Sequence, residues 1–515
     1  MKKTLSILAI LAMTATACNK VEITPNNGEP VPEVKMVYET ISGSSGSSTK
    51  ATIADSDAAF SWTENDHIAV HVSNGESHKY VFTSDAGASG ASETAATASF
   101  TVTYEAGYAR DAFAVFPSTI VSASAANYGQ DGYTLDVTLP DSYTLAQVSS
   151  TTTPCPMIAD NTGDSWAFKQ LCGMLRLTVN GIPADATGMV IQFPGKKVNG
   201  AFTIASPVTP GTSEIETGAP ADGEDQITIT FDAGITSATV NIPLPTGDYE
   251  DVLVTPVGSA TKVAATRFIK AGGYTATRAR AKKLTTTMVS FSVSATKKVF
   301  FAPGNLVKTD ATYTVGSGNE SYAFETTPFN TNGGSLGYDQ GAPTSTSARG
   351  YFTWGEIATA DETPRVFTVN GVSGWKALTY DECDYLQLYR AMNASVHRFY
   401  RIDLGSSGTQ VGFLIPPDGA TSADVAGLTE PMSASGSITE NVNVDTYISK
   451  GFVFLPAVGW YPTSWYEYWN DGGNMGYYWT TTTDGDYYYR YFYKGGQGDD
   501  YGPDDYYCSV RLVRE

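Results

Sequence analysis

Residues 173–181 read GMLRLTVNG, and this stretch decides the class of fold. Leu175, Leu177 and Val179 alternate with polar residues, which is the period of a strand with one buried face and one wet face. The Asn-Gly pair that ends the run, at 180–181, predicts a tight hairpin turn. The stretch therefore predicts antiparallel β structure.

The same alternation recurs over about 240 residues, from Thr52 to Phe291, and no long helical period interrupts it. That length is large for one β-sandwich, so we expect two, at 36–163 and 164–293. Their junction is predicted near Asn161–Ser165. The chain is accordingly predicted to be mainly β.

Composition narrows the classes of partner. The chain has 515 residues and a formal charge of -21, with 53 acidic against 32 basic side chains. Nucleic acid and anionic lipid headgroups are poor partners for such a chain. Aromatic residues make up 12% of it and include 31 tyrosines, which is typical of strands.

The N-terminus has the features of an export signal. Residues 1–17 (MKKTLSILAILAMTATA) combine two lysines with an apolar run too short to span a bilayer. Small residues then lead to Cys18, which resembles a bacterial lipobox. The resemblance implies cleavage before Cys18, its acylation and a lasting membrane anchor. An ordinary secretory signal with a chance cysteine is the alternative. Residues 18–35 are polar and proline-rich, and are predicted to be a flexible spacer.

Several short motifs lie in order through the first two predicted sandwiches. They are KAT (50–52), FSWTENDHIAV (60–70), AVFP (114–117), PMIA (156–159) and FKQLCGMLRL (168–177). Together they resemble the Bacteroidetes fimbrillin (Mfa-like) family, the pilins and adhesins of type V pili. The resemblance implies two tandem transthyretin-like β-sandwiches and pilus subunits as partners.

Residues 297–515 are denser in tryptophan, tyrosine and glycine. Thr379 and Glu382 form a capping box that predicts a helix reaching about Met392. The other motifs are VFFAPGNL (299–306), FTWG (352–355), GWKALT (374–379), GFLIP (412–416), FVFLPA (452–457), GYYWTTT (476–482) and CSVRLV (508–513). This order resembles the FISUMP-type major paralogous domain, and implies an α+β C-type-lectin-like fold at 297–515.

Four cysteines follow Cys18, at 155, 172, 383 and 508. An exported protein permits disulfides, but four buried free thiols are the alternative. The FISUMP family usually has an aromatic residue where Cys383 stands and rarely a cysteine at 508. These departures favour a bridge between Cys383 and Cys508, while pairing of Cys155 with Cys172 stays open.

No catalytic residue, metal or cofactor is predicted. His67, His71 and His78 lie near one another in sequence without other ligands at metal spacing, so a solvated strand face is favoured. Trp469-Asn470-Asp471 resembles the calcium motif of C-type lectins, with Glu430-Pro431 upstream, but Met432 replaces an expected asparagine. A turn is the favoured interpretation.

The loop 461–474 (YPTSWYEYWNDGGN) is the predicted binding element. Exposed aromatic rings with polar tips suit carbohydrate or protein surfaces, whereas Tyr478, Trp479 and alternate residues of 487–493 are expected in the core. The candidate ligand-binding residues are Trp465, Tyr466, Tyr468 and Trp469.

These features predict an outer-membrane, lipid-anchored surface protein for adhesion, pilus-associated at the tip or as an accessory. Its C-terminal head would bind a carbohydrate or a host protein. A stalk subunit would donate its C-terminal strand to a neighbour, but here a whole domain occupies that end. The alternative is a glycan-binding accessory lipoprotein of a nutrient-uptake system without a pilus. An enzyme of the sulfatase-modifying-factor type is a third, less favoured class.

Overall fold

The computed structural model describes residues 36–44, 62, 64, 66–76, 78–82, 97–121, 128–129, 132–149, 156–160, 165–205, 223–249, 251–261, 263–268, 274–278, 280–309, 321–324, 350–369, 372–390, 395–403, 411–428, 439, 442–460, 475–483, 487–493, 496–504 and 506–515. Strands dominate these residues and the helices are short. The predicted mainly β character is therefore confirmed.

The first part of the chain forms one curled sheet. Its order is β3-β2-β5-β9-β10-β1-β4, in which β1 pairs parallel with β10 and antiparallel with β4. Side chains from both ends of this order meet in one core, so the sheet curls around them. The strands are β1 (Met36–Ser44), β2 (Ala69–Ser73), β3 (His78–Phe82), β4 (Thr97–Glu105), β5 (Ala109–Phe116), β9 (Met157–Asp160) and β10 (Ser165–Gln170).

Trp62 lies at the centre of this first core and is fully buried. Its ring meets those of Phe100, Phe116 and Phe168 edge-on, at centroid separations of 5.0, 5.1 and 5.2 Å. Each such pair adds about 0.5–1.5 kcal/mol beyond the burial of its area. The motif at 60–70 thus supplies the residue around which the curled sheet packs.

Strand β2 is buried on both faces, which the sequence did not predict. Val70 points into the first core, whereas Ala69 points into a second cluster shared with β7 (Gly132–Leu139) and β13 (Gly200–Ala205). The last two strands pair antiparallel, beside β6 (Tyr128–Gly129). Because both faces are covered, His71 is fully buried, and the predicted solvated histidine face is wrong at this residue.

The second part has two facing sheets. In one, β11 (Gly173–Asn180) lies between β15 (Ser237–Leu244) and β20 (Ala281–Thr287). The other follows the order β18-β17-β12-β14-β8. Its strands are β8 (Ser142–Thr144), β12 (Gly188–Gln192), β14 (Gln226–Thr230), β17 (Asp251–Val257) and β18 (Ala265–Phe268), and β16 (Gly247–Tyr249) pairs with β19 (Tyr274–Ala276) nearby.

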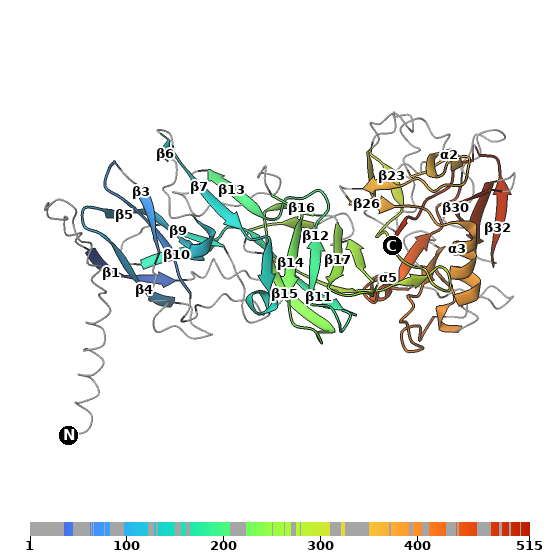
Figure 1. Cartoon of the computed structure of the whole chain (residues 1–515), viewed down its shortest axis with the longest axis horizontal. Helices are drawn as coiled ribbons and strands as arrows, with labels where there is room; N and C mark the ends of the chain where they lie inside the picture. Colours follow the sequence, from blue (N-terminus) through green and yellow to red (C-terminus); the bar gives the residue numbers. More distant parts are fainter. Residues whose placement is uncertain are drawn as a thin grey trace, which may run out of the picture.

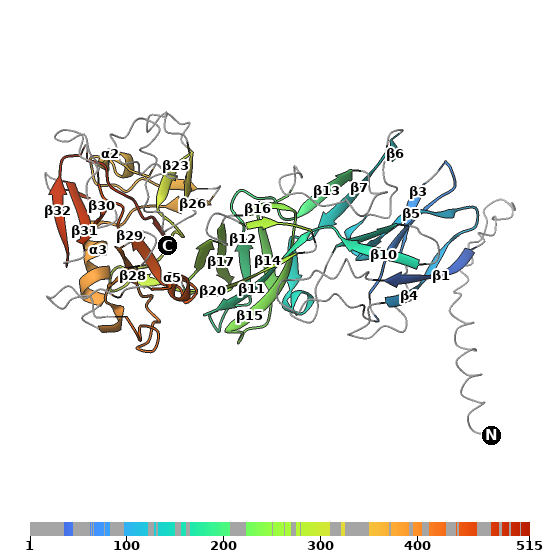
Figure 2. The same ribbon diagram turned by 180° about the vertical axis from the view of Figure 1, so that it is seen from behind.

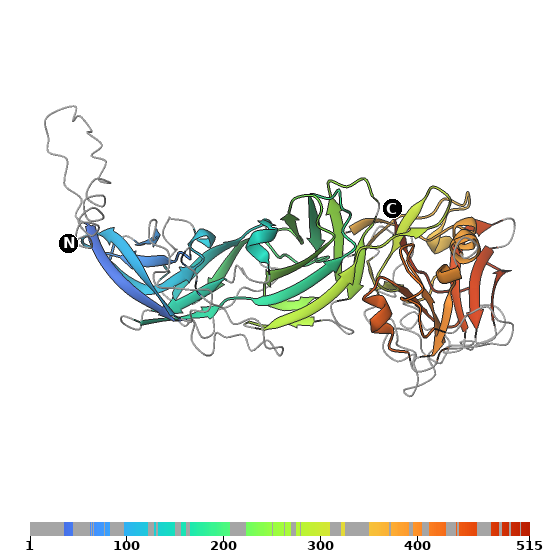
Figure 3. The same cartoon turned by 90° about the horizontal axis from the view of Figure 1, so that it is seen from below.

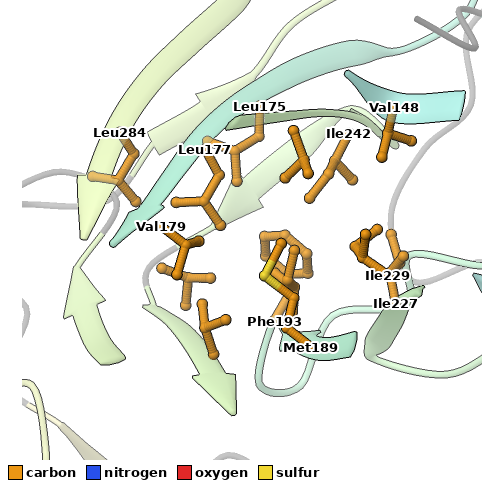
Figure 4. Packing of buried hydrophobic residues seen from close by; sticks show 14 of the residues in the cluster. Val148, Leu175, Leu177, Val179, Met189, Phe193, Ile227, Ile229, Ile242 and Leu284 are labelled. Carbon is orange, nitrogen blue, oxygen red and sulfur yellow. The ribbon is translucent and has the colours of Figure 1, made fainter. Parts of the chain in front are cut away.

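The core of this second part lies between its two sheets. Leu175 and Leu177 of β11 line one side, Ile229 of β14 lines the other, and Phe193 lies between them (Figure 4). The alternation in residues 173–179 therefore places these leucines as predicted. Burial of each such side chain contributes about 1.5–3 kcal/mol.

The Asn180-Gly181 pair ends β11 but does not form the predicted hairpin. The chain continues to β12 in the facing sheet, and β11 pairs instead with the distant strands β15 and β20. Gly181 has φ of 68°, and a Cβ there would lie 2.6 Å from the carbonyl oxygen of Met288. Glycine is thus required at 181 because the backbone at Met288 lies too close for a side chain. The antiparallel partner of β11 is nevertheless β15, which is distant in the sequence.

A single cut near residue 163 does not separate the two cores. Strand β10 follows that point but packs in the first core. Strand β8 precedes it but pairs with β14 of the second part. A boundary at residue 163 predicts that the chain passes once from the first part to the second, whereas the structure has it pass between them more than once.

The third part, called the head below, begins with a hairpin of β21 (Phe291–Ser292) and β22 (Lys298–Phe301). Small sheets and short helices then surround two main cores. The further strands are β23 (Leu306–Lys308), β24 (Tyr322–Phe324), β25 (Phe367–Val369), β26 (Val372–Trp375), β27 (Tyr400–Asp403), β28 (Val411–Ile415), β29 (Val453–Pro456), β30 (Met475–Thr483), β31 (Tyr487–Tyr493), β32 (Gly496–Gly502) and β33 (Val513–Arg514). The helices are α2 (Trp354–Ile357), α3 (Tyr380–Asp384), the π-helix η3 (Tyr385–Tyr389) and α5 (Val444–Ile448), and short 3₁₀ turns are η1 (Ser118–Ile120), η2 (Leu145–Val148) and η4 (Ser395–His397).

Residues 292–299, which span the predicted boundary between the second sandwich and the domain at 297–515, are built into the head. Phe291 and Val293 are buried in one of its cores. Asp418 accepts the Ser292 N–H at 2.9 Å and the Ser292 hydroxyl at 2.8 Å. The same carboxylate pairs with Arg390 and Lys298, at 3.3 and 3.1 Å. These contacts tie the entry of the head to its interior.

The second part also packs directly on the head. Leu253 and Ala264 belong to the same core as Phe300 and Trp375. The Thr287 hydroxyl donates to the Ser449 carbonyl at 3.0 Å. The second part and the head are therefore joined by packing as well as by the chain.

The three parts follow one another along an elongated molecule (Figure 1). Strands β1 and β4 lie at one end, while α3 and β32 lie in the head at the other, as the views from behind and from below also show (Figures 2 and 3). The head's far end is therefore the part most distant from the first described residues.

Candidate functional site

The site is organised by helix α3, whose start the sequence predicted. Thr379 caps it: its hydroxyl accepts the Glu382 N–H at 3.2 Å, and the Glu382 carboxylate accepts the Thr379 N–H at 3.0 Å. This capping box is confirmed. The helix then widens into the π-helix η3, a distortion often found at functional sites. Met392, the predicted helix end, lies outside the described residues.

Tyr380 and Asp384, one turn apart on α3, reach the neighbouring sheet. The Tyr380 hydroxyl donates to Asp499 of β32 at 2.7 Å. Asp384 accepts from Arg490 of β31 at 2.8 Å, and Arg490 lies 3.5 Å from Asp499. The guanidinium also covers the Tyr380 ring, 4.5 Å from its centroid. One cation thus binds two carboxylates and an aromatic face.

The pKa of Tyr380 is shifted mainly by its hydrogen bond to Asp499. This bond, together with burial, raises the pKa of Tyr380 to about 12. The phenol therefore stays protonated at neutral pH and remains a donor to Asp499.

The pairing of β31 with β32 extends this arrangement. Tyr488 lies opposite Tyr501, and Arg490 lies opposite Asp499, so the four side chains share one face of the sheet. The Tyr488 ring meets Tyr380 at 5.1 Å and Tyr501 at 6.2 Å. We call this set the tyrosine–aspartate face, and its members are Tyr380, Asp384, Tyr488, Arg490, Asp499 and Tyr501.

The opposite side of this sheet belongs to the interior of the head. Tyr477, Trp479 and Tyr489 are buried there in one core. Tyr478 lies opposite Arg490 in the sheet, so it is on the other face, where it is buried in a second core. The prediction of core positions is therefore confirmed for Tyr478, Trp479 and Tyr489, while Tyr487 and Tyr491 are partly buried against the same core as Tyr489. Burial raises the pKa of Tyr489 above its ordinary value.

A small cavity of about 60 Å³ lies between η3 and the sheets beside it. Its walls are mainly apolar and include Leu386, Phe399 and Ile415. Cys383, Gln387, Arg490 and Arg511 also line it. A volume of about 10–15 Å³ admits one water, so the cavity has room for a few water molecules or a very small group.

Cys383 and Cys508 are both free thiols, and the predicted bridge between them is not formed. Cys383 packs on the core that contains Tyr478, whereas Cys508 is buried in the core that contains Trp479. Successive strand residues point to opposite faces, so the β30 sheet separates the two cysteines. Burial raises the pKa of Cys383 to about 12, and that of Cys508 well above its ordinary value.

The other predicted site residues lie outside the described part of the chain. They are Cys18 and the loop residues Trp465, Tyr466, Tyr468 and Trp469. Cys155, Glu430-Pro431 and Asn470-Asp471 also lie outside it, so neither the second cysteine pair nor the calcium motif has described geometry.

Among the residues that the structure describes, no group of three or more histidine, cysteine or acidic side chains has a geometry for holding a metal ion. No helix in that part of the chain is long and apolar enough to cross a membrane.

Sequence reasoning missed Tyr380, Asp384 and Asp499 as members of a site. The tyrosine-rich run at 487–493 signalled the region, but the run does not show which residues of β32 or α3 meet it. That depends on strand register and on helix docking, which the sequence pattern leaves open.

No protein-family model matches this chain, and no curated protein matches it in sequence. Among solved structures, a candidate cell adhesion protein from Bacteroides ovatus is 13% identical, with a TM-score of 0.29 over 49% of this chain and 92% of its own. Another from Bacteroides uniformis is 16% identical, with a TM-score of 0.26 over 46% of this chain and 90% of its own. The tip fimbrial protein Mfa3 from Porphyromonas gingivalis, with a C-terminal truncation, is 12% identical, with a TM-score of 0.20 over 47% of this chain and 81% of its own. We derive neither the fold nor the function of this chain from these low-scoring likenesses.

Proposed function

We propose that this chain is a lipid-anchored surface adhesion protein that carries its binding head at the end away from the membrane. One observation carries the proposal: the tyrosine–aspartate face lies at the opposite end of the elongated molecule from β1 (Figures 1 and 2). An anchor at Cys18, followed by a spacer over 18–35, would hold the β1 end near the membrane. The face would then meet partners outside the cell.

The resemblance to fimbrillins suggests a pilus-associated role, as a tip or accessory subunit. Strand β33 supports this form of the proposal, because it is bound within the head. It pairs with β22 on one side, and Val513 exchanges backbone hydrogen bonds with Lys376 on the other. A strand held in this way is not free to complete the sheet of a neighbouring subunit.

The contacts between the second part and the head fit a load-bearing role. Leu253 and Ala264 enter the head core, and Asp418 binds the hairpin that begins the head. Force applied to the head would pass into the second part through these contacts. We further propose that the head binds its ligand without transforming it.

The second candidate is a glycan-binding accessory lipoprotein of a nutrient-uptake system. The aromatic and polar composition of the tyrosine–aspartate face favours it, since such surfaces suit sugars as well as proteins. Copurification separates the two: pilus subunits should accompany an adhesin, whereas transport components should accompany an uptake protein.

The proposed function is tested by cell adhesion. Cells that display the full chain should adhere to glycan- and protein-coated surfaces, and cells displaying a chain truncated after residue 287 should not. Equal adhesion by both cell types would overturn the proposal, and the amount of surface-exposed protein serves as the control.

A further inference from the structure

We propose that the tyrosine–aspartate face recognises a neutral oligosaccharide. This inference rests on the proposed function, because it names the class of ligand for the head that the proposal displays. The proposed site lies on α3, β31 and β32, whereas the predicted loop 461–474 lies outside the described residues.

The face presents an aromatic ring to solvent in a fixed orientation. Tyr501 is 57% exposed, and its ring packs against Tyr488 at 62°. Within the described ranges, Tyr501 and Tyr389 are the exposed aromatic side chains. Binding is favoured when an apolar surface covers an exposed aromatic ring and removes it from water. The C–H face of a sugar ring is such a surface.

Hydrogen-bonding groups surround that ring. Asp499 is 42% exposed, accepts a hydrogen bond from the Tyr380 hydroxyl, and forms an ion pair with Arg490 at 3.5 Å. A carboxylate has about four acceptor positions, so Asp499 keeps lone pairs for the hydroxyl groups of a ligand. A polyol beside Tyr501 would therefore find acceptors next to the ring.

Charge selects a neutral ligand over an ionic one. Arg490 already binds Asp384 and Asp499, so its charge is matched inside the face. The face keeps one carboxylate in excess, and the chain as a whole carries -21. That balance repels sulfated or sialylated glycans, and a basic peptide would have to compete with Arg490 for both carboxylates.

The face is also preorganised. Tyr380 is held by its hydrogen bond to Asp499, by the Arg490 guanidinium over its ring and by the edge of Tyr488. Few side chains would lose further freedom when a ligand binds, which lowers the entropic cost of recognition.

The test is an array that carries neutral oligosaccharides, sulfated and sialylated glycans and a lysine- and arginine-rich peptide. It is probed with the full chain, made soluble by Cys18→Ser, and with two variants. We expect binding to at least one neutral oligosaccharide, and an affinity loss of about tenfold or more in Tyr501→Ala. Tyr389→Ala is the matched control, because this exposed tyrosine stacks on Tyr385 of η3 and should leave binding unchanged.

Asp499→Asn is a second variant, which keeps the size of the side chain while removing its charge. It should weaken binding of the same oligosaccharide, with melting temperature as the check on folding. Binding to charged glycans or to the peptide alone, no binding to neutral oligosaccharides, or equal losses in Tyr501→Ala and Tyr389→Ala would each overturn the inference.

Cell adhesion distinguishes this failure from failure of the proposed function. If displayed protein mediates adhesion that survives periodate oxidation of the coated glycans, the adhesion proposal stands and the oligosaccharide inference fails. If cells with and without the protein adhere equally, the proposed function itself fails.

Discussion

Asp418 shows how much one residue contributes to the junction between the chain's second part and the head. Its carboxylate binds the backbone and hydroxyl of Ser292 together with Arg390 and Lys298. Arg390 is buried, so its charge depends on Asp418 for neutralisation. The role follows from a position in the fold rather than from any motif around residue 418.

Asp418→Ala should lower the free energy of unfolding by about 3 kcal/mol, because it leaves a buried cation without its carboxylate. Chemical denaturation measures the change. Asp424→Ala is the control, since Asp424 forms a more exposed ion pair with Lys450 at 3.3 Å and should cost about 1 kcal/mol or less. Similar losses in the two variants would contradict the assignment.

Comparing the wild type with Asp418→Ala also gives a prediction about how stability depends on pH. Burial acts to raise the pKa of Asp418, but the hydrogen bonds from Ser292 and the charges of Arg390 and Lys298 outweigh it and hold that pKa below its usual value. A depressed folded pKa stabilises the fold above the unfolded pKa of about 3.9, and that stabilisation is lost as pH falls towards the folded value. The stability difference between wild type and Asp418→Ala should therefore shrink below about pH 4. Denaturation at pH 3 to 7 checks it, and a difference that widens on acidification would refute it.

Cys383 and Cys508 yield a chemical prediction at the residue scale. Burial raises both thiol pKa values, so little thiolate exists at pH 8 and iodoacetamide should label neither residue in the native protein. Both should react after unfolding without a reductant. Mass spectrometry of the unreduced protein decides the matter, because a peptide linked through 383 and 508 would show that the sheet does not separate them.

At the scale of elements, the sequence correctly predicted a feature that depends on neighbouring residues, but not which strands pair with each other. The capping box at Thr379 and Glu382 is confirmed because both partners lie within one turn. The hairpin expected at Asn180-Gly181 is wrong because β11 takes its partners from β15 and β20, far along the chain. The tyrosine–aspartate face likewise depends on pairing. The tyrosine-rich pattern of β31 can be recognised in the sequence, but Asp499 and Tyr380 join the face only through the register of β31 with β32 and the packing of α3.

The β21–β22 hairpin gives a prediction about where the head begins. A fragment starting at 288 keeps Phe291 and Val293, which are buried in the head core, whereas one starting at 297 loses them together with Ser292. Loss of a buried phenylalanine side chain alone costs about 3–5 kcal/mol. The shorter fragment should therefore melt at a clearly lower temperature, as measured by calorimetry. Phe291→Ala in the longer fragment should reproduce much of the loss, and equal melting temperatures would show that the hairpin is dispensable.

At the scale of the whole molecule, the strand alternation predicted a mainly β chain in several parts. It did not predict that β8, β10 and β13 cross between the first two parts, since these exchanges are decided when the cores assemble. It also placed a domain boundary between residues 293 and 297, where the structure has a packed junction. In the resulting elongated molecule, β1 and the head lie at opposite ends (Figure 3).

That separation makes the proposed anchor and the head independently testable. Cys18→Ser should release the chain from the membrane, because the acyl chains that would hold it contribute about 0.8 kcal/mol for each buried methylene. The released chain should still bind its ligand on an array, while cells producing it should no longer adhere. Fractionation and incorporation of a labelled fatty acid measure the first effect, and Cys155→Ser is the control because it leaves the signal untouched. Membrane retention of Cys18→Ser would favour the ordinary secretory signal and another mode of attachment, whereas release with loss of array binding would mean that the head depends on the anchor for its structure.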